Sequence, residues 1–305
     1  MAATAPVARS GPTPKDWLLF AGLTVFGGSS FSMIRVAVET LEPATVAAGR
    51  MWTGAILLYV IMRAAGRTLP PLVTEGRLDS RWRSIIGVGI VGYAIPFFLF
   101  PWGQQTVPSG LAGIYMAFMP LATLALAHFL TDERLTVRKG IGFAIGFTGI
   151  GVLIGPDAVA RAGDGSALAQ GAILTAAVCY AVASIIVRRA PEMPARSLSA
   201  GAVLVAAVLL TPVALVFGAP SEGWTWGAAL SVVALGVFPT GLNAIIIILL
   251  VRSAGPSFMS FSNYLTPLVA VGLGWAAFGE RLALSSFIAL GIILAGLAVS
   301  RSGAR

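Results

Sequence analysis

Charged side chains are scarce in this sequence, and their scarcity excludes a water-soluble fold. Asp, Glu, Lys and Arg make up only 10% of the residues, whereas a soluble domain carries about 25%. Hydrophobic residues make up 57%, and the mean hydropathy is +0.89. They are gathered in long runs without charges, and no soluble protein covers so much apolar surface. The composition therefore predicts an all-α integral membrane protein.

Residues that carry catalysis and metal binding are also nearly absent. The sequence has one His and one Cys, so an intramolecular disulfide is impossible and no zinc cluster can form. All twelve Asp and Glu lie in tails, in loops or in the last turns of apolar runs. We therefore expect no catalytic residue, no metal and no cofactor.

Ten apolar runs have about the length of ~17–25 residues that a membrane-spanning helix needs. The predicted spans are 17–36, 43–62, 84–103, 107–130, 140–155, 167–187, 198–217, 226–250, 256–278 and 285–300. Glycine and proline inside these runs do not argue against helices, because membrane helices tolerate both. In spans five and ten, Gly142 with Gly146 and Gly291 with Ala295 have the spacing of small residues at close helix contacts.

Basic residues predict the orientation of the spans. Sixteen of the twenty Lys and Arg lie in the N-terminal tail, in the loops after spans two, four, six and eight, or at the C-terminus. Only Arg35, Arg161 and Arg281 lie on the opposite side, and Arg50 falls within span two. Both termini are therefore expected in the cytoplasm. Residues 1–16 are expected to be a disordered cytoplasmic tail, because they are rich in Ala, Pro, Ser and Thr.

One stretch occurs twice in the sequence. "PLATLALAHFLTDERL" begins at Pro120, and "PLVAVGLGWAAFGERL" begins at Pro267, with matched residues 147 positions apart. Since the copies lie five spans apart, an odd number, they end on opposite membrane faces. We therefore expect two inverted five-helix repeats, 17–160 and 161–305. Inverted repeats are typical of proteins that open alternately to the two sides of a membrane.

The sequence resembles the drug/metabolite transporter superfamily, and within it the EamA-type exporters. The two stretches that begin with Pro and end in Glu-Arg-Leu carry the resemblance most specifically. "FGGSSFSMIR" (26–35) resembles the motif of the first helix, with Phe26 where Trp is usual, and "CYAVASIIVRR" (179–189) is its partner in the sixth. "AAGRMW" (47–52) resembles the start of the second helix. The resemblance implies export of metabolites or amino acids across a bacterial inner membrane.

Polar and aromatic residues inside the spans are the candidates for a cavity lining, because polar groups in hydrocarbon are costly. The resemblance implies a cavity among spans one, three, four, six, eight and nine. The candidate substrate-binding residues are Ser30, Tyr93, Phe97, Phe100, Tyr115, Met119, Tyr180, Asn243, Asn263 and Tyr264. For each of them, ordinary helix packing is the competing interpretation, since aromatic residues also pack in cores and at membrane interfaces.

Five further residues are candidates for gating or structural roles. Arg50 lies seven residues after Pro43, about 10 Å below the external surface, and is expected to extend outward to water rather than contact substrate. Pro96 and Pro239 remove helical hydrogen bonds and leave carbonyl groups free. Glu133 and Glu280 are expected to hold the turns that follow spans four and nine.

These features favour an exporter of small, mainly apolar metabolites, in particular hydrophobic or aromatic amino acids. The expected partners are the lipid bilayer and a small-molecule substrate, without nucleic acid, and we expect a monomer. The absence of acidic residues inside the spans argues against ion coupling through a carboxylate, which leaves His128 as the candidate for any pH dependence of transport. The alternatives are an organophosphate or sugar-nucleotide carrier of the same superfamily, a membrane-embedded transferase, and a scaffold that transports nothing.

Overall fold

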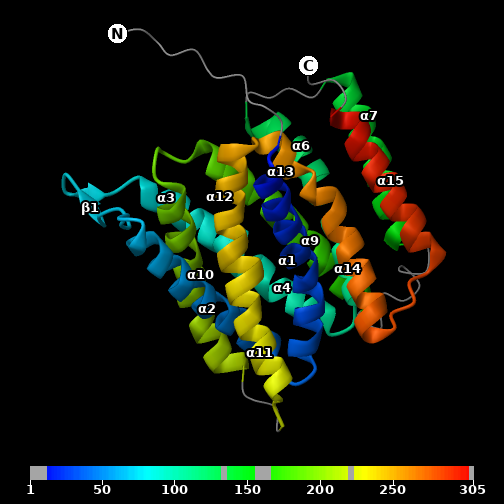
Figure 1. Ribbon diagram of the computed structural model, residues 1–305, viewed down its shortest axis with the longest axis horizontal. Helices are drawn as coiled ribbons and strands as arrows, with labels where there is room; N and C mark the ends of the chain where they lie inside the picture. The colour runs from blue at the N-terminus through cyan, green and yellow to red at the C-terminus, as the bar shows by residue number, and fades with distance from the viewer. Residues whose placement is uncertain (1–11, 132–135, 155–165, 219–222, 302–305) are drawn as a thin grey trace.

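The computed structural model describes residues 12–131, 136–154, 166–218 and 223–301. In these ranges the chain is helical apart from loops and one short antiparallel hairpin, β1 (Val73–Thr74) and β2 (Arg77–Leu78). The helices run side by side in one bundle, and the hairpin projects from it (Figure 1). The predicted all-helical membrane class is confirmed.

The first five predicted spans are all helical. The elements are α1 (Pro14–Val38), α2 (Pro43–Ala64), α3 (Arg81–Gly87), the π-helix η1 (Val88–Ala94), α4 (Ile95–Gln104), α5 (Ser109–Met116), α6 (Met119–Leu130) and α7 (Val137–Ile154). Span three is thus one continuous helix, Arg81–Gln104, with a π-helical section in its middle. Span four is interrupted between α5 and α6.

The second set of spans repeats this order. The elements are α9 (Ser166–Arg189), α10 (Ala195–Phe217), α11 (Trp226–Leu235), the π-helix η3 (Gly236–Leu242), α12 (Asn243–Ser253), α13 (Pro256–Ser260), α14 (Ser262–Phe278) and α15 (Leu284–Arg301). A π-helical section recurs in span eight and an interruption recurs in span nine. The same irregularities in the same order support an internal duplication, while the inverted arrangement stays a prediction.

Eight of these helices are long and apolar enough to cross a membrane, by length and composition. Spans nine and ten are helical too, but α14 has 17 residues and the apolar part of α15 is shorter than the other candidates. That spans nine and ten also cross the membrane, which would make ten crossings, therefore stays a prediction. The cytoplasmic position of the termini stays a prediction too.

Helix α1 begins before its predicted start at residue 17. Pro14 occupies its first turn, and the Thr13 hydroxyl accepts a hydrogen bond from the Asp16 backbone N–H, while Asp16 Oδ2 accepts one from the Thr13 backbone N–H. This reciprocal cap, with proline in the first turn, is a strong helix start. The predicted disorder of residues 1–16 is therefore wrong for 14–16, and residues 1–11 lie outside the described ranges.

Helix α1 lies in the centre of the bundle, whereas α7 and α15 pack together at one side (Figure 1). A Cβ added to Gly142 of α7 would lie 2.5 Å from the carbonyl oxygen of Gly296 of α15. Close backbone contact between these two helices was predicted, but Gly291 has no atom near a Cβ at its position. Gly296 makes the contact instead, because it lies on the face of α15 that meets α7.

Candidate functional site

A central cavity of about 330 Å³ lies between the helices of the two predicted halves. Its lining comes from both halves and includes α1, α2, span three, span four, α9, span eight and α14. The lining residues are Gly27, Ser30, Phe31, Ile34, Arg50, Tyr93, Phe97, Phe100, Met116, Met119, Tyr180, Pro239, Thr240, Asn243, Ala244, Ile247, Asn263 and Thr266. A ligand in this cavity would contact both halves at once.

Aromatic rings form one wall of the cavity. Phe97 lies at its centre, with ring centroids 5.4 Å from Tyr93 and 6.0 Å from Tyr180. Phe100 continues the wall, 6.3 Å from Tyr180 and 5.6 Å from Phe31. Three of these contacts are edge-to-face, the arrangement that aromatic pairs favour. The wall presents an apolar surface with two phenol hydroxyl groups.

Arg50 lies within this cavity, so the prediction that it extends outward to water is wrong. The residue is only 5% exposed. Its Nε donates a 3.0 Å hydrogen bond to Thr240 Oγ1, and its Cζ lies 4.0 Å from the centre of the Phe97 ring. A cation over a desolvated ring gains about 2 kcal/mol. These two contacts offset only part of the desolvation cost of several kcal/mol that a buried guanidinium carries.

The acceptor for Arg50 lies directly after Pro239, in the π-helical η3. In an α-helix the N–H of residue 239 would donate to the carbonyl of Leu235, but proline has no N–H. The Thr240 hydroxyl donates to Leu235 O at 2.9 Å, within the π-helical η3. This bond orients the hydroxyl, so that a lone pair of Oγ1 faces Arg50. Pro239 lines the cavity beside this threonine.

Two amides and one hydroxyl add polar groups to the lining. Asn243 is 8% exposed, its Nδ2 donates to Leu23 O at 3.4 Å, and its Oδ1 is buried without a partner in the described residues. Asn263 and Ser30 also line the cavity. No Asp or Glu lies among the described lining residues, so Arg50 has no acidic counter-charge there.

The remaining predicted residues lie elsewhere. Tyr115 is fully buried, and its hydroxyl donates to Gln170 Oε1 at 2.6 Å, so its predicted place in the lining is wrong. Tyr264 packs against the same core as Tyr115. Pro96 lies in the first turn of α4 and is buried outside the lining. Glu133 lies outside the described residues.

Several lining residues were not predicted. Phe31, Ile34, Met116, Ala244 and Ile247 are apolar residues in apolar helices, which carry no distinguishing signal in the sequence. Gly27, Thr240 and Thr266 are small residues whose position depends on helix rotation. Thr240 had one usable signal, because it follows a proline inside a span.

Glu280, just after α14, contacts α1 and α5 at the end of the bundle opposite to the start of α1. Its carboxylate accepts hydrogen bonds from Ser109 N at 2.9 Å, Ser109 Oγ at 2.8 Å and Gly110 N at 2.9 Å, at the start of α5. Arg35 Nη1 completes the set at 3.0 Å. A Cβ at Gly274 would lie 2.4 Å from Glu280 Oε2, so only glycine leaves room there. The predicted role of Glu280 at the turn is consistent with these contacts, which we name the Glu280 clasp.

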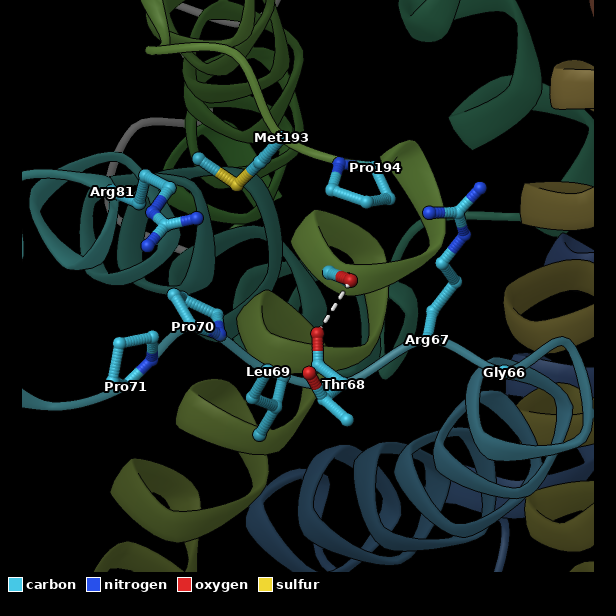
Figure 2. A pocket seen from close by; sticks show the side chains of 10 residues that line it. Gly66, Arg67, Thr68, Leu69, Pro70, Pro71, Arg81, Met193 and Pro194 are labelled. Carbon is cyan, nitrogen blue, oxygen red and sulfur yellow. Dashed lines mark hydrogen bonds between the residues drawn. The ribbon is translucent and has the colours of Figure 1, made fainter.

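A second hollow, of about 230 Å³, lies where the segment after α2 meets the start of α10 (Figure 2). Ser197 Oγ donates a 2.8 Å hydrogen bond to Thr68 O across this junction. Arg81, at its edge, pairs with Asp79, and these hydrogen bonds hold the pKa of the Asp79 carboxyl well below its usual range. Figure 2 shows the Arg67 side chain directed away from Arg81. The described lining of this hollow contains no aromatic residue, and the hollow lies between a loop and a helix. The central cavity lies between long helices instead.

Apolar helices around a central cavity, with a lining drawn from both parts of the chain, define a multi-pass helical membrane protein with an internal cavity. The chain belongs to the EamA-like transporter family, whose family model matches residues 15–155 and again 168–302. The predicted family is thereby confirmed, and the protein is a multi-pass transporter of the inner membrane.

Relatives that align over most of this chain are named as transporters. The uncharacterized inner membrane transporter YedA of Escherichia coli K12 is 29% identical over 90% of this chain and 87% of its own. YoaV of Bacillus subtilis, an uncharacterized transporter, is 23% identical over 93% and 95%. The S-adenosylmethionine/S-adenosylhomocysteine transporter of Chlamydia trachomatis is 24% identical over 92% and 86%. A solved crystal structure with 22% identity has a TM-score of 0.65 over 94% of this chain and 97% of its own, which supports the fold.

Proposed function

We propose that this transporter exports small, mainly apolar metabolites, in particular hydrophobic or aromatic amino acids, from the cytoplasm. The observation that carries this proposal is the aromatic wall of the central cavity, formed by Phe31, Tyr93, Phe97, Phe100 and Tyr180. Ring faces and edges bind apolar and aromatic side chains well. The relatives named as transporters support a small solute as the cargo.

The proposed mechanism is alternating access between two inverted halves. A cavity lined by both halves changes its opening when one half moves against the other, while the bound solute stays near the middle. The Glu280 clasp joins α1 and α5 of the first half to the end of α14 in the second. On the predicted topology this clasp closes the external side, and it opens when the solute leaves.

We further propose that the gradient of the solute itself drives export. Proton- and sodium-coupled carriers commonly use a carboxylate at the binding site, and the described lining has none. His128 lies outside the cavity, packed beside Phe129 with ring centroids 4.9 Å apart. An apolar amino acid is a zwitterion without net charge, so its own movement is not driven by the membrane potential.

The test is counterflow of labelled amino acids into proteoliposomes. We expect saturable flux of hydrophobic and aromatic amino acids that stops at equal concentrations and is unaffected by an imposed pH or sodium gradient. Phe97→Ala is expected to change the order of preference among solutes, whereas Phe217→Ala, at a 70% exposed side chain of α10, leaves it unchanged. Absence of flux with every amino acid refutes the proposal, and accumulation driven by a pH gradient refutes the uncoupled mechanism.

The alternatives fit the cavity less well. Organophosphates and sugar nucleotides carry two negative charges, which several basic groups usually hold, whereas Arg50 is the one basic residue in the described lining. A transferase needs a nucleophile with a base or a metal. The described residues hold no group of three or more His, Cys, Asp or Glu that fits a metal ion.

A further inference from the structure

We infer that Arg50 is the receptor for a carboxylate of the transported solute, so that the protein selects apolar solutes that carry a carboxylate over those that do not. This inference deepens the proposed function and rests on it. It assigns to Arg50 a role in specificity, where the sequence indicated an outward-facing side chain.

The first argument is the unbalanced charge of Arg50. An arginine stays protonated in proteins, and a buried cation without a counter-charge is unfavourable inside a membrane. The described lining residues include no Asp or Glu, and the ion pairs of Arg35 with Glu280 and of Arg81 with Asp79 involve other residues. An anionic solute group supplies the missing charge when the cavity is occupied.

The second argument is the geometry of the guanidinium group. The Nε hydrogen bond to Thr240 and the contact of Cζ with the Phe97 ring fix the plane of the group from two sides. In the described residues, that bond to Thr240 is the one hydrogen bond that Arg50 donates to protein. The two terminal amino groups remain for a ligand, and a guanidinium binds a carboxylate best through two parallel N–H···O bonds.

The third argument concerns the surroundings of Arg50. Tyr93 and Tyr180 contact Phe97 from two sides, and all three residues line the cavity with Arg50. Their phenol groups can donate to a carboxylate oxygen, while the rings cover the apolar part of the solute. Asn243 adds a buried oxygen without a partner in the described residues, which can accept from an N–H group of the solute once the amide turns.

A purely structural role is the competing explanation. In that case Arg50 would only link α2 to η3 through Thr240. That link uses one of five N–H donors, and a neutral side chain could make it without burying a charge. The structural role therefore explains the hydrogen bond, but it does not explain a cation at this depth.

The experiment measures binding to the purified protein of three probes that share one apolar body. They are L-phenylalanine, L-phenylalaninamide without the carboxylate, and 3-phenylpropanoate without the ammonium group. We expect the wild type to bind the amide about 10- to 100-fold more weakly than the amino acid, the range for loss of a charge-assisted hydrogen bond. The des-amino acid is expected to keep most of the affinity.

Variants locate the effect. In Arg50→Gln the preference for acid over amide is expected to fall to within about threefold, and in Arg50→Lys part of it returns because the charge returns. Arg63→Gln removes an exposed charge from the same helix and is expected to leave the preference unchanged. A merely structural arginine would change the affinity for acid and amide equally, so the ratio distinguishes the two roles.

Each outcome decides between the proposals. Equal binding of acid and amide to the wild type overturns this inference, and so does an unchanged ratio in Arg50→Gln. If Arg50→Gln does not fold, the wild-type probe series and Arg50→Lys still decide. Flux of amino acids without acid–amide discrimination leaves the proposed function standing and overturns only the carboxylate receptor. Discrimination through Arg50 without flux supports the receptor and refutes export.

Discussion

Replacing Glu280 by Gln is expected to destabilise the transporter substantially. The side chain of Glu280 is only 6% exposed, and its carboxylate accepts hydrogen bonds from Ser109 N, Ser109 Oγ and Gly110 N as well as from Arg35. Hydrogen bonds to a charged group contribute about 1.5–3 kcal/mol each. Glutamine keeps one acceptor oxygen, and water reaches the Arg35 side, which is 37% exposed. We therefore expect the free energy of unfolding to fall by about 2–4 kcal/mol, which is less than the sum over the individual hydrogen bonds.

The assay is the free energy of unfolding in mixed micelles, measured for paired variants. Gly274→Ala places a Cβ 2.4 Å from Glu280 Oε2, so the carboxylate must move. This variant is expected to lose about as much free energy of unfolding as Glu280→Gln. Gly272→Ala, on the same helix, meets nothing within 4 Å and is the matched control, expected within about 0.5 kcal/mol of the wild type.

The two changes at the clasp are expected to be non-additive. In a Glu280→Ala background the Cβ of Gly274→Ala has no carboxylate to displace, so its further cost should fall below about 1 kcal/mol. If Glu280→Gln unfolds within 0.5 kcal/mol of the wild type, or if Gly274→Ala costs the same in both backgrounds, the clasp does not hold the bundle together as the contacts indicate.

Three further predictions concern topology, pH and helix packing. Cysteines introduced at Glu75 and Trp224, in a background without the native cysteine, are expected to react with impermeant reagents from opposite sides, and reaction from one side would refute the inverted repeats. The β1–β2 hairpin is expected to lose protection from hydrogen exchange below about pH 4. The pKa of Asp79 is lower in the folded state than its unfolded value of about 3.9, so the ionised carboxylate stabilises the hairpin above that pH and this stabilisation fades as the pH falls. The variant Asp79→Asn should remove this pH dependence. Gly142→Ala is expected to cost about 1–3 kcal/mol of unfolding free energy through contact with a backbone oxygen of α15, whereas Gly151→Ala, in open space, should change little.

Much of the cavity lining could be predicted from the sequence, because polar and aromatic side chains stand out in apolar helices. Asn243 and Asn263 are unfavourable against lipid, which places them inside the bundle. Tyr93, Phe97 and Phe100 share one helix face at the expected spacing. The structure brings all five to one cavity.

The rest depends on contacts between distant segments. Thr240 lies 190 residues from Arg50, and no local pattern pairs them. Tyr115 has the same chemistry as Tyr93, but its hydroxyl bonds Gln170 of α9 and it does not line the cavity. The π-helical sections were not predicted either, and they change which residues of spans three and eight face inward. Residue type thus indicated the kind of site, while helix rotation decided its members.

The buried charge of Arg50 has a consequence for the kinetics of transport. A zwitterion adds no net charge, so the cavity carries about one positive charge whether it is empty or occupied. Moving one elementary charge through the full membrane field corresponds to about 2.3 kcal/mol per 100 mV. On the proposed alternating-access mechanism with a zwitterionic solute, a negative interior therefore favours the inward-open state in both the loaded and the empty protein, and the two contributions cancel over a full cycle. Voltage should change how fast vesicles equilibrate and leave the final distribution of solute unchanged.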